Sequence, residues 1–236
     1  MEWYWIVLIC VGACAVWLLL SAALYKQFFK RFYDIVLSAL AIIVLSPLLI
    51  VLTIIGAIAM KGNPFFVQKR PGRINKKTGQ EKIISLLKFR TMINAKDENG
   101  NLLPDGDRLN KYGKLLRSTS LDELPSLLNI LIGDLSIVGP RPLLVKYLPL
   151  YSDEQRRRHL IRPGLTGYAQ VHGRNGVNWD IKFAMDLKYI EHISLCRDLE
   201  ILIGTIFSVL KREGVTQVGQ ATMEDFEDYV KSKGRE

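Results

Sequence analysis

The chain has 236 residues, 49% of them hydrophobic, and carries a formal net charge of +9. This length suffices for one soluble domain plus a membrane segment. The basic excess suits anionic lipids, phosphorylated small molecules or nucleic acid. Nucleic acid is excluded as an expected partner, because no helix-turn-helix, zinc-finger spacing or aromatic–glycine RNA motif is present. The three cysteines form neither a disulfide framework nor a zinc-binding pair.

Apolar residues are concentrated before residue 61, and this shift in composition marks a boundary in the chain. Trp3–Tyr25 is an uncharged run, long enough to cross about 30 Å of hydrocarbon as a helix, with aromatic residues at both ends. The alternative, a cleaved signal peptide, lacks a basic n-region. Lys26, Lys30 and Arg31 follow the run and no basic residue precedes it, so the positive-inside rule places residue 26 in the cytoplasm.

A second apolar stretch, Ile35–Met60, is also uncharged and has basic residues on both flanks. Ser46-Pro47 lies near its middle, where proline kinks or breaks a helix and the serine hydroxyl can cap a freed backbone group. A re-entrant helix–break–helix hairpin over Asp34–Met60 keeps both flanks in the cytoplasm. A straight spanning helix with a proline kink is the alternative.

After residue 61 the chain is charged and interrupted by turns, and we predict a small α+β, mainly helical domain. Strands are expected at Pro64–Gln68 and Ile83–Phe89, with a basic turn at Lys69–Arg73 between them and a surface loop at Asp97–Asp107. Helical periodicity predicts further helices at Lys111–Arg117, from Ser120 to Gly133, and at Ser152–His159, Trp179–Ile190 and Ser194–Glu213.

Four regions follow from this pattern: a transmembrane helix at 1–27, a membrane hairpin at 28–61, a cytoplasmic domain at 62–213 and a polar, peripheral tail at 214–236. The segment Ser194–Glu213 is amphipathic. Its broad apolar face fits a helix in the protein core and a helix at the membrane interface equally well.

Two adjacent carboxylates, Asp122 and Glu123, stand at the expected start of a helix. Acids at this position ordinarily complement the helix dipole, and Glu123 with Ser120 also fits a capping box. A carboxylate pair also suits Mg²⁺, which binds one or two carboxylates together with substrate phosphates. The pair is therefore a candidate site whose interpretation depends on its neighbours.

Three arginines lie near rigid Gly/Pro turns, where bidentate phosphate recognition is favoured. Arg117 precedes the acids, and two prolines hold Arg141 within Gly139–Pro142, although an ordinary exposed turn explains that segment too. Arg162 opens Arg162–Gly167, which allows the same two interpretations. Acids for a metal and arginines for phosphate are the groups that phosphoryl transfer needs. No HExxH, GxSxG, Walker A or GxGxxG motif offers a rival chemistry.

Taken together, the ordered motifs resemble the monotopic phosphoglycosyl transferases of the bacterial sugar transferase family, in their short form. The matching segments are Phe28–Asp34, Gln68–Gly72, Lys88–Met92, Ser118–Asn129, Gly133–Tyr147, Arg162–Gly173 and Lys211-Arg212. The resemblance implies a re-entrant hairpin broken at a Ser-Pro pair, which Ser46-Pro47 matches. The extra helix at Trp3–Tyr25 departs from the short form and leaves open an anchor, a partner contact or part of a homodimer.

The resemblance also implies the chemistry. Asp122 would attack the β-phosphate of a UDP-sugar, release UMP and pass the phosphosugar to polyprenyl (undecaprenyl) phosphate, a ping-pong course. Mg²⁺ would be bound at Asp122 and Glu123. The residues that match phosphate-holding or further motif positions are Arg117, Arg141, Arg162, Lys88 and Asp186.

This likeness implies a protein of the bacterial inner membrane whose catalytic domain lies on the cytoplasmic face. Its partners would be the UDP-sugar, the polyprenyl phosphate and membrane lipid, with glycosyltransferases downstream in glycoconjugate, capsule or exopolysaccharide assembly. Two other classes stay open: a membrane-anchored scaffold that uses only the basic membrane-proximal segment, and an enzyme that hydrolyses rather than transfers. The sugar itself is open between an N-acetylated sugar and a hexose.

Overall fold

The computed structural model describes residues 3–173, 177–210 and 225–234. Within these residues the chain is mainly helical, with two small sheets. The helices are α1 (Trp3–Ala23), α2 (Lys30–Ala59), α3 (Asp105–Arg108), α4 (Lys111–Thr119), α5 (Leu127–Ile132), α6 (Asp153–Arg156), α7 (Tyr168–His172), α8 (Trp179–Glu191), α9 (Leu195–Leu210) and α10 (Phe226–Ser232). The strands are β1 (Phe65–Ile74), β2 (Glu81–Phe89), β3 (Ser136–Val138) and β4 (Gly164–Thr166).

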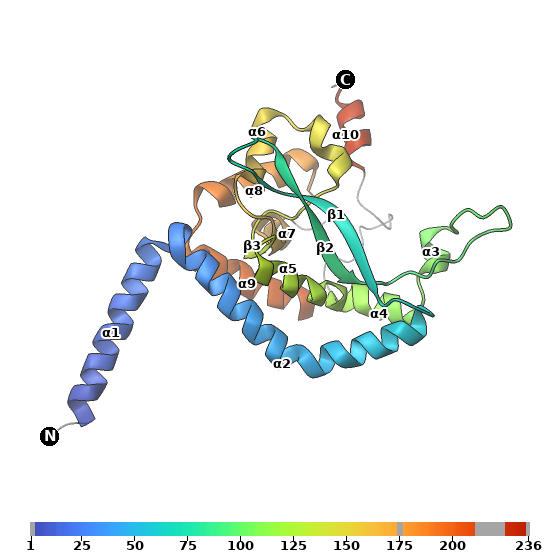
Figure 1. Cartoon of the computed structure of the whole chain (residues 1–236). Helices are drawn as coiled ribbons and strands as arrows, with labels where there is room; N and C mark the ends of the chain where they lie inside the picture. Colours follow the sequence, from blue (N-terminus) through green and yellow to red (C-terminus); the bar gives the residue numbers. More distant parts are fainter. Residues whose placement is uncertain (1–2, 174–176, 211–224, 235–236) are drawn as a thin grey trace.

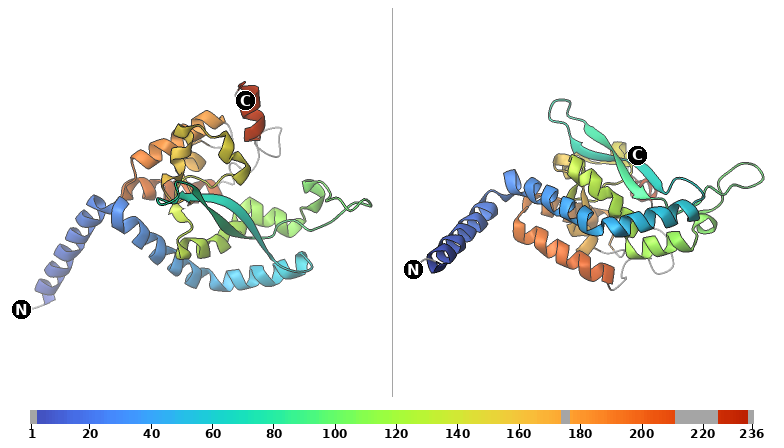
Figure 2. Two further views of the ribbon diagram at one scale, coloured as in Figure 1. Left: turned by 45° about the horizontal axis from the view of Figure 1, so that its top comes forward. Right: turned by 60° about the horizontal axis from the view of Figure 1, so that its bottom comes forward.

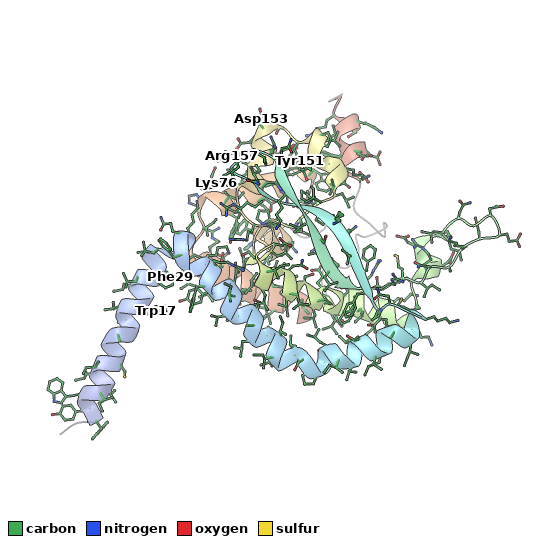
Figure 3. All side chains as sticks on the ribbon, viewed as in Figure 1. Trp17, Phe29, Lys76, Tyr151, Asp153 and Arg157 are labelled. Carbon is green, nitrogen blue, oxygen red and sulfur yellow. The ribbon has the colours of Figure 1, made fainter. Side chains whose placement is uncertain are left out.

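Helix α1 projects away from the rest of the chain, and its large apolar side chains are exposed (Figure 1). A π-helical turn, Tyr25–Phe29, leads directly into α2. At this elbow the rings of Trp17 and Phe29 meet edge to face with centroids 4.9 Å apart (Figure 3). The helical conformation predicted from Trp3 is confirmed, and the crossing of a membrane by this helix stays a prediction.

Helix α2 continues through Pro47 and is bent near its middle (Figure 2). Pro47 has no N–H to donate to the carbonyl of Ile43, and the Ser46 hydroxyl donates to that carbonyl instead, at 2.7 Å. The expected break is therefore a bend in a single helix. Tyr25–Ala59 is the one helix in the described residues that is long and apolar enough to cross a membrane.

Both ends of α2 are attached to the polar domain. Near its start, the buried Asp34 carboxylate accepts a hydrogen bond from the backbone N–H of Ile137 in β3, at 2.9 Å. Near its end, the Tyr112 hydroxyl from α4 donates to the carbonyl of Leu52, at 2.8 Å. The bent helix thus lies along one side of the domain with both ends against it (Figure 1).

The predicted hairpin is confirmed, but β1 is longer than expected. Its antiparallel register with β2 runs from Phe65 opposite Phe89 to Ile74 opposite Glu81. The segment expected to be a basic turn, Lys69–Arg73, is strand, and its Pro-Gly is accommodated by an irregularity between Pro71 and Ile74. The hairpin packs on α5, and the buried core there comprises Ile84, Leu86, Leu127, Ile130 and Leu135.

A second sheet, which the sequence analysis did not predict, pairs β3 with β4 in parallel. A β-carbon on Gly164 would lie 2.1 Å from the backbone nitrogen of Gly139, and one on Gly167 would lie 2.2 Å from the Gly139 carbonyl oxygen. Only glycine allows this approach between the two chain segments. The close contact fixes the turns that carry Arg141 and Arg162.

The helix expected from Ser120 begins differently. Ser120 adopts a left-handed conformation with φ of 56° and caps nothing with its side chain, so the predicted capping box is wrong. Leu121–Ser126 forms a 3₁₀ helix because Pro125 has no N–H for a regular α-helical bond. Regular helix starts only at α5, and Gly133, with φ of 93°, ends it as predicted.

The positions of the remaining helices were predicted correctly, whereas the prediction for the C-terminal tail was wrong. Helices α4, α6, α8 and α9 match predicted segments, although residues 211–213 lie outside the described part. The tail from residue 214 was expected to be peripheral; residues 214–224 and 235–236 are outside the described part, but α10 packs onto the domain. Phe226 is 1% exposed and contacts the rings of Tyr147, Trp179 and Phe183. Aromatic burial outweighs the polar composition here.

Candidate active site

Glu123 is the centre of a charged cluster built from three separate segments. Its Oε1 atom accepts from Lys88 Nζ at 2.6 Å and from Arg141 Nη2 at 2.8 Å. Lys88 comes from the end of β2, Glu123 from the 3₁₀ helix before α5, and Arg141 from the turn after β3. The capping and dipole explanations of the acid pair therefore do not account for Glu123, whose carboxylate is a counter-ion for two cations.

The two acids differ in their electrostatics. Burial opposes ionisation of Glu123, but the charges and hydrogen bonds of Arg141 and Lys88 hold its pKa at about 2. Burial and the negative charge of Glu123 raise the pKa of Asp122. Among the described residues, nothing donates a hydrogen bond to the Asp122 carboxylate. Carboxylates whose environments shift their pKa values apart ordinarily have separate roles.

Both acids line a cavity of about 580 Å³, which is the size of an ordinary small-molecule site. One wall is charged and includes Lys88, Arg117 and Arg141. Another part of the lining comes from α9, which contributes Leu202, Thr205 and Val209. The cavity therefore combines cationic side chains, which suit a phosphate, with apolar ones.

Arg117 reaches the same cavity from α4. Its Nε donates to Thr91 Oγ1 at 3.1 Å, and its terminal nitrogens have no acidic partner among the described residues. Three of the predicted phosphate ligands, Lys88, Arg117 and Arg141, are thus brought together with Asp122.

Asp186 lies outside the cavity and acts through another residue. Its carboxylate is buried against Arg158, with Nη2 of the arginine 2.6 Å from Oδ2. The same Nη2 donates to the backbone carbonyl of Arg141 at 2.8 Å. Asp186 therefore positions the turn that carries Arg141.

Arg162 also lies apart from the acids. Its Nε donates to the carbonyl of Gly133 at 2.8 Å, and its side chain lines a second hollow with Arg73 and Lys82. Phosphate binding by Arg162 stays a prediction, at a place other than Asp122.

The sequence analysis missed two residues that build the site, Arg70 and Arg158. Arg70 lines a small hollow beside Lys88, Glu123 and Arg141. The basic run Lys69–Arg73 was read as a turn, and the alternation of a strand, which turns Arg70 to the site, was the overlooked signal. Arg158 was missed because its partner is 28 positions away in the sequence.

The acid pair fits the expected cation in number and kind of ligand. No group of three or more His, Cys, Asp or Glu side chains suited to a metal occurs in the described residues. Mg²⁺ needs only one or two carboxylates when substrate phosphates complete its shell. Asp122 is free of hydrogen bonds, and both contacts to Glu123 use Oε1, so Oε2 is available.

The described residues thus include a long apolar helix and a cavity that two acids and three cations line. The family model for bacterial sugar transferases matches residues 25–212. An uncharacterized sugar transferase of Bacillus subtilis, EpsL, is 47% identical over 199 residues, covering 84% of this chain and 95% of that protein. The exopolysaccharide production protein ExoY of Sinorhizobium fredii is 36% identical over 206 residues, covering 78% of this chain and 87% of that protein.

A third relative is the UDP-glucose:undecaprenyl-phosphate glucose-1-phosphate transferase of Klebsiella pneumoniae. It is 38% identical over 189 residues, which are 76% of this chain but 39% of that protein. The chain belongs to the bacterial sugar transferase family and is a transferase. All of α1 precedes the matched region.

Proposed function

We propose that this protein is a phosphoglycosyl transferase, which moves a sugar 1-phosphate from a UDP-sugar to undecaprenyl phosphate. The observation that carries the proposal is the free carboxylate of Asp122 in one cavity with Lys88, Arg117 and Arg141. The name of the Klebsiella relative supports the donor and acceptor, and that of ExoY supports a place in exopolysaccharide assembly. The product would then pass to glycosyltransferases.

The proposed reaction has two displacements at one phosphorus atom. A carboxylate oxygen of Asp122 attacks the β-phosphorus of the UDP-sugar, the bond from that phosphorus to the bridging oxygen breaks, and UMP leaves. An oxygen of undecaprenyl phosphate then attacks the same phosphorus. The bond to Asp122 breaks, which regenerates the carboxylate and leaves a lipid diphosphate sugar. Splitting one transfer into two displacements is the usual gain of covalent catalysis.

The neighbouring residues have distinct roles in this scheme. Lys88, Arg117 and Arg141 bind phosphate oxygens and stabilise charge that develops on them. Glu123 stays ionised and holds Lys88 and Arg141 in place. Mg²⁺, held by Asp122 and Glu123, would neutralise charge on the diphosphate. The raised pKa of Asp122 leaves it a stronger nucleophile once ionised.

We place the cavity at the cytoplasmic surface of the inner membrane. Support comes from α2, whose two ends contact the same domain, so that α2 would enter and leave on one side. Helix α9 supports a cavity at the membrane surface, because one of its faces lines the cavity and another exposes apolar side chains. The exposed residues are Leu199, Ile203, Ile206 and Phe207. A lipid phosphate would then meet Asp122 at headgroup level. A homodimer through α1 stays a prediction.

Cysteine accessibility tests this topology. In a variant whose native cysteines are serine, single cysteines replace Lys26 or Lys61, and intact cells are treated with an impermeant thiol reagent. Re-entry predicts that both positions are protected in cells and both react after lysis. Reaction of only one position in intact cells would mean that α2 crosses the membrane.

The function is tested by UMP release from a panel of UDP-sugars, with Mg²⁺ and undecaprenyl phosphate. Wild type should release UMP with a matching donor and need the lipid for sustained turnover. Asp122→Asn should be inactive yet folded, and Asp153→Asn, at an exposed acid in α6, should be fully active. Full activity in Asp122→Asn removes Asp122 as nucleophile. Release of free sugar phosphate without lipid would indicate a hydrolase, and no UMP from any donor favours the scaffold.

A further inference from the structure

A second hollow lies outside the cavity of Asp122, where the far half of the β1–β2 hairpin meets the end of α5. Its volume is about 220 Å³, and Arg73, Lys82, Asp134 and Arg162 line it. Arg31, from the first turn of α2, converges on the same place. Residues from four parts of the chain thus gather three guanidinium groups, although the transfer chemistry uses none of them.

Helix capping explains only part of this gathering. Arg31 donates to two carbonyls at the end of α5, at 2.6 and 2.8 Å, and Arg162 Nε donates to the carbonyl of Gly133 at 2.8 Å. Cations are favoured at such a helix end. Within the described residues, however, the terminal nitrogens of Arg162 and the whole guanidinium of Arg73 have neither a hydrogen bond nor an ion pair.

The cluster is short of negative charge. Asp134 is the acid that lines the hollow, and Lys82 Nζ already pairs with it at 2.7 Å. Asp34 is within electrostatic reach of Arg162, but two groups of β3 already donate to its Oδ1 atom. Burial and the other two guanidiniums lower the pKa of Arg162. Like charges held together in this way are stabilised when an anion enters between them.

The hollow lies close to an exposed apolar surface of α2, which faces hydrocarbon in the topology proposed above. Phe32 and Ile35, the next residues of α2 on its apolar side, are 47% and 40% exposed. Arginines one turn from such a surface are at the depth of lipid headgroups. We infer that Arg31, Arg73 and Arg162 form a second phosphate site, which binds the headgroup phosphate of an anionic membrane lipid. The same chemistry accepts a soluble phosphate, and the inference does not depend on transfer at Asp122.

The test is a lipid titration of the detergent-solubilised full chain, followed by thermal unfolding. Phosphatidylglycerol, phosphatidylcholine and inorganic phosphate are the three probes. Wild type should gain stability as phosphatidylglycerol is added, because a ligand of the folded state stabilises it. In Arg73→Gln the titration midpoint should move to about fivefold higher lipid, the effect of about one basic residue at an anionic surface. Lys77→Gln, at an exposed lysine of the same hairpin, should titrate like wild type.

Measurements without lipid separate binding from a structural role. Arg73→Gln should then unfold at the same temperature as wild type or higher, since one of three like charges is removed. A lower unfolding temperature would mean that Arg73 supports the fold, and would overturn the inference. So would equal phosphatidylglycerol titrations for Arg73→Gln and wild type, or an equal response to phosphatidylcholine. Inorganic phosphate could stabilise wild type as much as phosphatidylglycerol does, with a weaker response in Arg73→Gln. The three arginines would then still form a phosphate site, and its ligand would be a soluble phosphate.

Discussion

Replacing Glu123 with glutamine should lower the pKa of Asp122. Burial and the charge of Glu123 raise that pKa, whereas Lys88 and Arg141 lower it. Glutamine keeps the size of the side chain and removes the negative charge. The two cations, freed from their counter-ion, then act on Asp122 alone. Both changes favour the ionised form of Asp122.

The size of the effect follows from Coulomb's law. Two carboxylates about 6 Å apart, at an effective dielectric constant of about 20 to 40, repel each other by about 1.4 to 2.8 kcal/mol, or about one to two pKa units. Asp122 must be ionised to attack, so the rate rises with pH through its pKa. The acid limb of the kcat/KM profile should therefore move down by about one to two pH units in Glu123→Gln. The rate itself should fall, because Lys88 and Arg141 lose the group that positions them.

Single-turnover UMP release with enzyme in excess would measure this limb even in a slow variant. Glu98→Gln, at an exposed acid in the loop before α3, is the control and should keep the wild-type profile. Carbodiimide labelling of protonated Asp122, followed by mass spectrometry, gives the same pKa without turnover. An acid limb that stays in place or moves upward would refute the electrostatic account.

Loss of stability on protonation of Glu123 in the wild-type protein does not interfere with the measured acid limb. The pKa of Glu123 is lowered from 4.5 to about 2 in the folded protein. Its contribution to stability is therefore fully present above pH 4.5 and is lost as the pH falls toward 2. At pH values above 4.5 the acid limb therefore does not report the protonation of Glu123.

Three further changes test how the site is held. Gly164→Ala should separate β3 from β4 and lower both the unfolding temperature and UMP release. Gly106→Ala, where a β-carbon would meet open space, should change neither. Wild-type stability in Gly164→Ala would contradict the close approach of the two strands. Asp186→Asn leaves the buried charge of Arg158 unpaired, so the free energy of unfolding measured with denaturant should fall by about 3–5 kcal/mol. The variant should also have a lower kcat, and an unchanged kcat would mean that Asp186 does not position Arg141. Phe226→Ala should lower stability by about 3–5 kcal/mol, and wild-type stability would mean that α10 does not pack there.

The elements that the sequence predicted are those with a local cause. Helices α4, α8 and α9 have apolar periodicity over two or more turns, and Gly133 ends α5 by its positive φ. The hairpin followed from β-branched and aromatic residues on both sides of turn residues. Residue chemistry suggested that Asp122 and Arg141 serve one site, whereas Lys88 was implied only by a resemblance, since no periodicity relates the three.

The elements that were missed depend on distant contacts. Strands β3 and β4 have three residues each, too few for a pattern, and their pairing rests on glycines about 25 positions apart, Gly139 and Gly164. Ser120 satisfies the pattern of a capping box, yet Lys88 and Arg141 attract the Glu123 carboxylate more strongly than one backbone N–H does. Two charged partners thus outweigh a local helix signal, and this competition is not visible along the chain.

Helix α2 and Arg141 are joined by a short path of contacts through β3. Asp34 of α2 accepts from the backbone N–H of Ile137, and two residues later Gly139 begins the turn that ends at Arg141. A change in the depth or tilt of α2 would therefore be transmitted to β3 by a buried hydrogen bond, rather than through a loop. Because β3 is pressed against β4 at Gly164, it cannot absorb the movement locally. On this geometry, the position of α2 and the placement of Arg141 next to the Asp122–Glu123 pair are structurally linked.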